Sequence, residues 1–177
     1  LAFATTTPPM AEEDQTVRLG ELLGVPSDAS RQSFGNSTRA GTRALVAARD
    51  ALLADEDVAT ALVVASDAPS GGPDTTHGHA AGAGAAAFLL REDGAATLVE
   101  SAEHAVEFAG TRFRETGAED LDGLDITSYD RTAFVETAAG AADGLDADPT
   151  DADAVVVQAP DGDLPYRVTG SPGVRHG

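Results

Sequence analysis

Two uninterrupted apolar runs limit the fold of this 177-residue chain more than any other feature of its sequence. Residues 61–65 and 82–90 each have the length of a strand and carry no charged side chain. Strands that are apolar at every position are covered on both faces, which is typical of the sheets of α/β proteins. Residues 39–54 are apolar over most of a helical circumference, which predicts a buried helix. Together these segments predict a layered α/β fold.

The other predicted elements follow from local signals. Residues 1–4 have the composition of a buried strand, which Pro8 and Pro9 end. The acidic residues 12–14 favour the first turn of a helix that Gly24 ends. Its inner side is predicted to hold Val17, Leu19, Leu22 and Leu23. Further strands are predicted at 97–100 and 154–157, and a helix at 130–145. Residues 31–38 are a short polar segment that runs into the helix at 39–54, residues 68–81 a loop, and residues 108–131 a loop or an insertion. Because the first residue is Leu1, we expect the chain to be part of a longer one.

The charge balance predicts a haloadapted protein. The sequence has 30 acidic residues against 11 basic ones, all of them Arg, and a formal net charge of −19. Such repulsion destabilises a compact state at low salt and is screened at high salt. A disordered acidic chain is the alternative, but an apolar content of 42% favours a folded one. Nucleic acid and anionic membranes are unsuitable partners, because they would be repelled.

Other compositional features exclude several classes of site. The chain has no cysteine, which excludes disulfides, thiolate metal sites and a cysteine nucleophile. No apolar run approaches the roughly 20 residues that a membrane span needs. The first residues lack the basic region of a signal peptide. We therefore expect a cytoplasmic protein.

Polar residues gather at three predicted strand ends or helix starts, at 5–7, 36–38 and 158–162. In α/β sheets, ligand sites form at the carboxyl ends of strands and the helix N-termini that follow them. The three clusters therefore contain the candidate site residues.

Four segments resemble the thiolase superfamily, and within it the archaeal branch similar to hydroxymethylglutaryl-CoA (HMG-CoA) synthase and to ketoacyl synthase III. They are residues 3–9, residues 36–45, residues 63–67 with 82–87, and residues 157–162. The second resembles the nucleophile turn Ala-Cys-x-Ala/Gly-Gly-Thr, the third a strand with a Gly-x-Gly-Ala-Ala pair, and the fourth a His-x-Pro-Asn-Gly turn. The resemblance implies a thiolase-like layered α-β-α(-β-α) fold, here an incomplete part of it. Residues 1–91 would belong to its N-terminal half, and residues 92–177 would begin its C-terminal half.

The resemblance also implies which residues occupy the catalytic positions. In the family a Cys at a helix N-terminus takes the acyl group from coenzyme A as a thiolate, a His polarises the thioester, and in the synthase branch a Glu acts as acid and base. Thr38 stands at the Cys position, Gln158 at the His position and Thr6 at the Glu position; a shift of one residue would place Ser37 at the Cys position. A threonine hydroxyl needs a nearby base to act as a nucleophile, and an amide is no base. The standard acyl-transfer route is therefore missing its reactive groups.

Each candidate also has a plainer interpretation. Ser37 and Thr38 are typical of helix N-caps. Gln158 can hydrogen-bond its own loop. His77 and His79 are more typical of exposed loop histidines than of metal ligands, so no metal is expected. Among the arginines, Arg112 and Arg114, with Arg131, either hold the phosphates of coenzyme A or pair with neighbouring carboxylates.

Three functions stay open at this point. The first is a protein similar to HMG-CoA synthase that binds acyl-CoA, with a coenzyme A thioester as ligand or substrate and with altered or lost catalysis. The second is an acyltransferase whose hydroxyl nucleophile uses a base outside this segment. The third is a non-catalytic subunit that scaffolds a thiolase or HMG-CoA synthase assembly. The resemblance implies a homodimer, or association with a thiolase and a zinc-ribbon/OB-fold protein.

Overall fold

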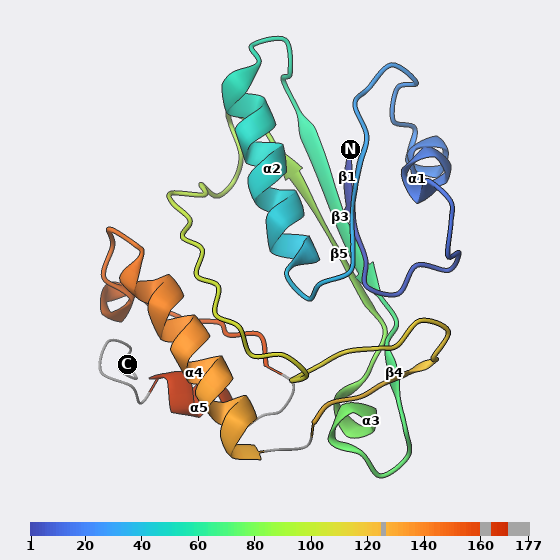
Figure 1. Ribbon diagram of the computed structural model, residues 1–177. Coiled ribbons are helices and arrows are strands. Elements are labelled where there is room, and N and C mark those ends of the chain that lie inside the picture. Colours follow the sequence, from blue (N-terminus) through green and yellow to red (C-terminus); the bar gives the residue numbers. More distant parts are fainter. Residues whose placement is uncertain (125–126, 160–163, 170–177) are drawn as a thin grey trace. The chain divides into compact units, whose positions relative to one another are not determined.

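The computed structural model describes residues 1–124, 127–159 and 164–169, which form two compact units (Figure 1). The first unit comprises residues 1–69 and 82–97. The second comprises residues 70–81 and the described residues from 98 onward. The predicted division between residues 91 and 92 into two halves of a larger fold stays a prediction.

The first unit contains a four-stranded sheet in the order β2-β1-β3-β5. Its strands are β1 (Ala2–Ala4), β2 (Gln32–Phe34), β3 (Ala61–Asp67) and β5 (Gly84–Leu90). Strands β2, β1 and β3 are parallel, whereas β5 is antiparallel to β3. The strands expected within 1–4, 61–65 and 82–90 are therefore confirmed. Strand β2 lies in the polar segment 31–38, where no strand was predicted, because two of its three residues are exposed and give no apolar signal.

Helix α2 (Ala40–Ala54) packs on the sheet through a narrow face of alanines. Ala40, Ala44 and Ala48 are buried one turn apart against Ala2, Ala4 and Val63, and these six residues form the core of the unit. The expectation that this helix is covered all round is wrong for the described chain, since Leu53 on its other side is 78% exposed. Alanine allows the helix to approach the strands closely along one line, and the remaining face stays open.

Strand β5 also differs from the prediction. We expected it to be covered on both faces, but six of its seven residues are exposed. Helix α2 packs against β1, β2 and β3, so the outer strand β5 receives little cover. Phe88 is consequently 54% exposed although it pairs with the buried Val63.

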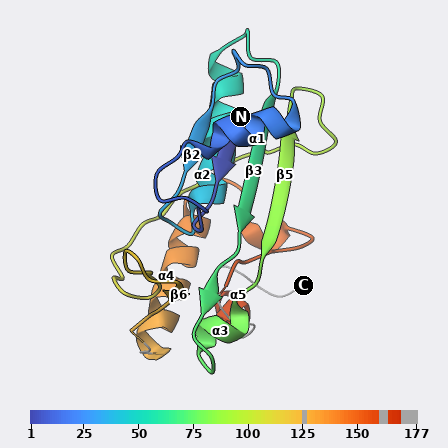
Figure 2. The ribbon, with the colours of Figure 1, turned by 90° about the vertical axis from the view of Figure 1, so that its right-hand side faces the viewer.

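Helix α1 (Gln15–Leu23) lies on the side of the sheet opposite α2 (Figures 1 and 2). Gly24 ends the helix with a left-handed backbone (φ 69°), as predicted. The predicted inner face is wrong: Leu22 is 79% exposed, and the buried positions are Thr16 and Gly20. Gly20 is buried because the guanidinium group of Arg31 lies over it, which a larger side chain would prevent.

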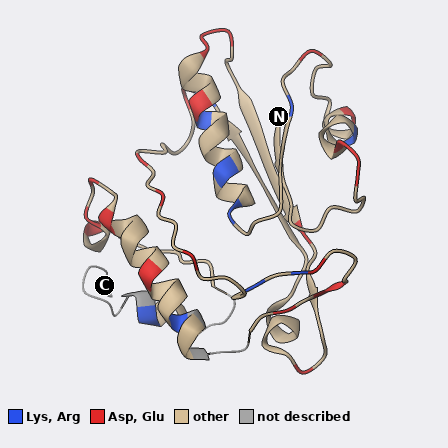
Figure 3. Cartoon of the chain, in the orientation of Figure 1, with Lys and Arg blue, Asp and Glu red and all other residues tan. Residues whose placement is uncertain are grey.

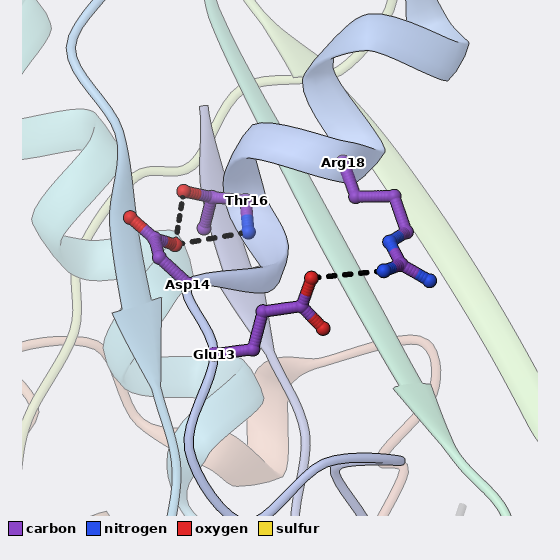
Figure 4. Close-up of polar contacts among 4 residues, drawn as sticks. All are labelled: Glu13, Asp14, Thr16 and Arg18. Atoms are coloured by element: carbon purple, nitrogen blue, oxygen red, sulfur yellow. Dashed lines mark hydrogen bonds and ion pairs between the residues drawn. The ribbon is translucent and has the colours of Figure 1, made fainter.

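Asp14 is the N-cap of helix α1 (Figure 4). Its Oδ1 accepts hydrogen bonds from the backbone N of Thr16 at 3.0 Å and from the Thr16 hydroxyl at 2.6 Å. These bonds lower the pKa of the Asp14 carboxyl. Beside it, Glu13 forms an exposed ion pair with Arg18 at 2.9 Å. Asp14 therefore stabilises the start of the helix, whereas the exposed ion pair of Glu13 contributes little to stability.

We expect Asp14→Ala to lower the free energy of unfolding by about 1 kcal/mol at neutral pH, because it removes a helix cap. A carboxyl whose pKa is lower in the folded state stabilises the protein above its unfolded pKa of about 3.9 and loses that effect as the pH falls through its folded pKa. The difference between the two proteins should therefore shrink in acid. Denaturant unfolding at pH 7 and at pH 3 measures it. Glu13→Gln is the control, with an expected change under about 0.5 kcal/mol; an equal loss in both variants would contradict the cap.

The second unit combines short strands with helices. Strand β4 (Ser70–Gly71) pairs in parallel with β6 (Asp120–Leu121), and helix α3 (Thr76–Ala80) follows β4. Helix α4 (Thr127–Asp143) packs against α5 (Leu164–Thr169), and a short 3-10 helix, η1 (Pro149–Asp151), lies between them in the chain. Helix α4 confirms the prediction of a helix at 130–145, with its start three residues earlier. The predicted loop at 108–131 therefore contains β6 and the first turn of α4.

Two predicted strands of this unit are wrong. Residues 97–100 and 154–157 are irregular, and their valines Val99 and Val156 are 85% and 95% exposed. A short apolar run becomes a strand only where a partner strand forms hydrogen bonds with its backbone N–H and C=O groups. Ala102 and His104 instead lie near Gly144 and Gly140 at the end of α4. The Glu100 carboxylate accepts from the backbone N of Asp146 and Ala147, just after this helix, at 3.1 and 2.9 Å. None of the helices in the described ranges is long and apolar enough to cross a membrane.

Candidate site at the carboxyl edge of the sheet

The candidate site lies where the three parallel strands of the first unit end. Thr5–Thr7 follow β1, Gly35–Thr38 follow β2, and Asp67 is the last residue of β3. The backbone N of Thr5 donates to the Phe34 carbonyl at 3.0 Å, which joins the first two segments. Parallel strands have their carboxyl ends at one edge, so Thr6 and the Ser37–Thr38 turn lie at the same edge of the sheet.

Asp67 organises this edge. Its Oδ1 accepts from the hydroxyls of Thr5, Thr6 and Thr7 at 3.2, 3.0 and 3.4 Å, and from the backbone N of Thr6 at 2.5 Å. The Thr7 hydroxyl also accepts from the backbone N of Ala68 at 2.8 Å. One carboxylate therefore ties the turn after β1 to the end of β3.

Sequence reasoning did not identify Asp67 as a site residue. It was treated as the end of an apolar strand, although it is the single charged residue of that strand. A lone carboxylate at the carboxyl end of a buried parallel strand was the signal that could have found it. Its partners are threonines from a distant segment, and no spacing within the sequence predicts that contact.

The turn before α2 is closed by Ser37. The backbone N of Arg39 donates to the Ser37 hydroxyl oxygen at 3.2 Å, and the backbone N of Ala40 donates to the Ser37 carbonyl at 2.9 Å. Asn36 has a left-handed backbone (φ 59°), a conformation that Asn tolerates better than most residues. Thr38 is exposed and makes no side-chain hydrogen bond within the described part of the chain. These contacts form a turn ahead of the helix. The N-cap of α2 is Arg39, which makes no side-chain capping hydrogen bond, so the expectation that Ser37 or Thr38 caps this helix is wrong.

The start of α2 is also positively charged. A helix N-terminus carries a partial positive charge from its unpaired backbone N–H groups. Arg39 and Arg43 add two exposed guanidinium groups one turn apart there, whereas acidic residues are numerous elsewhere in both units (Figure 3). This end of the first unit therefore combines hydroxyls, backbone donors and two cationic side chains with the carboxylate of Asp67.

The remaining candidate residues belong to the second unit. Gln158 is exposed in the irregular segment before residue 160, and residues 160–162 of its motif lie outside the described ranges. Arg112 is half-buried and Arg114 is exposed, on either side of Phe113, which bridges to Asp122. Arg112 forms no ion pair with any described residue, so the alternative that it pairs with a neighbouring carboxylate is not observed among these residues. The roles of Gln158, Arg112 and Arg114 stay predictions.

The two histidines of the 77–79 segment lie in helix α3. His77 is half-buried and its Nε2 lies near Gly123, while His79 is exposed. The described residues contain no group of three or more side chains able to hold a metal ion.

Comparisons with known proteins place the fold. No family model matches the chain, and no curated protein matches it in sequence. Solved structures of HMG-CoA synthases do match it in fold. "MvaS in complex with 3-hydroxy-3-methylglutaryl coenzyme A" superposes with a TM-score of 0.70 and 22% identity over 81% of this chain and 34% of the other. An HMG-CoA synthase complexed with CoA superposes with a TM-score of 0.68 and 22% identity, over 79% of this chain and 36% of the other.

A third similar structure is the HMG synthase of the curacin biosynthetic pathway in complex with acetyl donor-ACP. It gives a TM-score of 0.69 and 16% identity over 85% of this chain and 38% of the other. The chain therefore has an incomplete thiolase-like α/β fold of the kind found in HMG-CoA synthases, as the sequence predicted. It spans about a third of the length of these proteins.

Proposed function

We propose that the chain binds coenzyme A thioesters at the carboxyl edge of β1, β2 and β3, without the acyl transfer of an HMG-CoA synthase. The observation that carries this proposal is the shared position of Thr6 and the Ser37–Thr38 turn at the start of α2. They occupy the places that the resemblance assigns to the acid-base Glu and the nucleophilic Cys. Two of the similar structures are complexes with CoA or HMG-CoA, as their names state.

Electrostatics support the same edge as the place for an anionic ligand. Coenzyme A carries several negative charges, which a chain of net charge −19 repels in general. The start of α2, with Arg39 and Arg43, is a local exception. Guanidinium groups and helix N-termini both bind phosphates well. Arg112 and Arg114, which belong to the second unit, are proposed separately as residues that bind phosphate groups.

Lost catalysis follows from the side chains at these positions. The chain has no cysteine. The Ser37 oxygen is engaged in a turn, and within the described part of the first unit neither Ser37 nor Thr38 donates a hydrogen bond to a base. Gln158 at the third position has no titratable group near neutral pH. Acyl transfer to a hydroxyl requires a base, so binding without turnover is the proposed state.

A second candidate function is that of a non-catalytic partner subunit in a thiolase or HMG-CoA synthase assembly. The observation that favours it is the presence of exposed large apolar side chains in the first unit, on α2 and on both faces of β5; Leu53, Phe88 and Leu89 are 78%, 54% and 60% exposed. The partner that covers them would be a second copy of the chain, a thiolase, or a zinc-ribbon/OB-fold protein. We further propose a haloadapted protein of the cytoplasm.

Calorimetric titration of the chain with CoA and acetyl-CoA in molar KCl tests the proposal. We expect saturable binding, and no mass increase of the protein after incubation with acetyl-CoA or acetoacetyl-CoA. Thr38→Phe should weaken binding at least about tenfold, since a clash of about 1.4 kcal/mol has that effect. Thr60→Phe is the control, because Thr60 is exposed at the opposite end of β3.

Other outcomes separate the candidates. A stable acyl adduct on Thr38 or Ser37, abolished by the corresponding alanine variant, would contradict lost catalysis. Unchanged binding by Thr38→Phe would contradict the site, and no CoA binding in molar KCl would leave the partner-subunit function.

A further inference from the structure

The hydrogen bonds of Asp67 determine whether the Thr6 hydroxyl acts as a donor or as an acceptor toward a ligand. A hydroxyl has one proton to donate and two lone pairs to accept with, whereas an ionised carboxylate only accepts. The contact between the Thr6 hydroxyl and Asp67 Oδ1, at 3.0 Å, therefore uses the single proton of Thr6. Toward any further group, this hydroxyl is left as an acceptor.

The neighbouring threonines hold this arrangement in place. The Thr5 hydroxyl donates to Asp67 and accepts from the backbone N of Thr7 at 3.1 Å. The Thr7 hydroxyl donates to Asp67 and accepts from the backbone N of Ala68. The backbone N of Thr6 is bound to the same carboxylate oxygen. Rotation of the Thr6 hydroxyl proton toward a ligand would therefore break one contact of a connected network, which is costly in a half-buried place.

We propose that Asp67 sets the hydrogen-bond polarity of this edge, so that Thr6 selects acyl groups that bear a hydroxyl over plain acyl groups. A ligand hydroxyl can donate to Thr6. A plain acyl chain offers no donor, and a carbonyl brought against Thr6 would place two acceptors face to face. This inference deepens the proposed function and rests on it, because it requires coenzyme A thioesters to bind at this edge. Thr6 and Asp67 then act as specificity-determining residues.

Two matched ligands test this inference. Butyryl-CoA and 3-hydroxybutyryl-CoA differ by one hydroxyl, so the ratio of their dissociation constants isolates the hydrogen bond to Thr6. We expect the full chain in molar KCl to bind the hydroxylated ligand about three- to tenfold more tightly, the range for one hydrogen bond. Thr6→Val keeps the shape of the side chain and removes the acceptor, so its ratio should fall to about one.

Variants of Asp67 test its part in the selection. Asp67→Ala releases the threonine protons, so the Thr6 hydroxyl can also donate, and acetoacetyl-CoA, whose 3-carbonyl would face an acceptor in the unaltered chain, should gain affinity relative to 3-hydroxybutyryl-CoA. Asp67→Asn retains an oxygen that accepts from the threonines and should keep most of the preference, even if Asp67→Ala does not fold. Asp14→Ala is the control for destabilisation elsewhere in the first unit and should keep the full ratio.

A general loss of stability does not change the ratio of the two dissociation constants, because it weakens the binding of both ligands alike. Equal affinities in the unaltered chain, or an unchanged preference in Thr6→Val, would overturn the inference while leaving the proposed function intact. Absence of binding by CoA and by both ligands would overturn the proposed function and this inference with it.

Discussion

Raising KCl from 0.1 M to 2 M is expected to increase the melting temperature of the chain by about 6–12 °C. The cause is the net charge of −19, whose self-repulsion opposes the compact state. The Debye length falls from about 10 Å at 0.1 M to about 3 Å at 1 M, so most of this repulsion is screened. If the relief amounts to about 3 kcal/mol, the size of the chain converts it into the shift given above. Thermal unfolding followed by circular dichroism measures the shift.

A variant with less charge provides the control for the salt effect. Glu12, Glu56 and Glu92 are exposed, and their side chains form no hydrogen bond or ion pair with a described residue. Replacing all three with Gln changes the formal net charge from −19 to −16 (−19 + 3). The variant should melt at a higher temperature than the unaltered chain at 0.1 M KCl and should gain less from added salt. A melting temperature that stays flat or falls with KCl would contradict haloadaptation.

Arg31→Ala is expected to cause the largest loss of stability of any single surface substitution considered for the first unit. The guanidinium group donates four hydrogen bonds, of 2.8 to 3.4 Å, to backbone carbonyls of the loop between α1 and β2; these belong to Val25, Pro26, Ser27 and Ala29. It also lies against Gly20 of α1. Hydrogen bonds from a charged donor are each worth about 1.5–3 kcal/mol. Because water replaces part of them, we expect a loss of about 2–4 kcal/mol, or roughly 5–15 °C in melting temperature.

Two further variants show whether the shape of the guanidinium group is responsible. Arg31→Lys keeps the charge but not the planar set of donors, so it should recover less than half of the loss. Arg18→Ala removes an exposed ion pair with Glu13 and should change stability by under about 0.5 kcal/mol. Equal stability of Arg31→Lys and the unaltered chain would show that charge alone accounts for the effect.

The parts of the fold that could be predicted are those with strong local signals. The apolar run of β3 and the alanine-rich helix α2 have lengths and compositions that few other structures accommodate. The glycine at 24 marks the end of α1 because a left-handed backbone is easiest for glycine. Strand β2 could not be predicted in the same way, since its pairing with β1 depends on a chain reversal through α1. The covered face of α1 was also missed, because the burial of Gly20 depends on Arg31.

The sequence could indicate where the candidate residues stand along the chain but not the contacts that they make. The resemblance indicated Thr6, Ser37 and Thr38, and the parallel strands place them at one edge. The carboxylate that ties this edge together, Asp67, emerged only from the structure, because its three hydroxyl partners lie about sixty residues away in the sequence. Ser37 is a further case: residue type favoured it as the N-cap of α2, but its hydroxyl accepts from Arg39 in a turn ahead of the helix, and the N-cap is Arg39 itself.

Titration of the ¹⁵N-labelled chain with CoA in molar KCl, followed by amide chemical shifts, tests the central claim most directly. The claim is that coenzyme A thioesters bind at the carboxyl edge of β1, β2 and β3. We predict saturable shifts, with a single dissociation constant, for the amides of residues 5–7, 36–39 and 67–68. Saturable shifts confined to other parts of the chain, or no shifts at millimolar CoA, would contradict it.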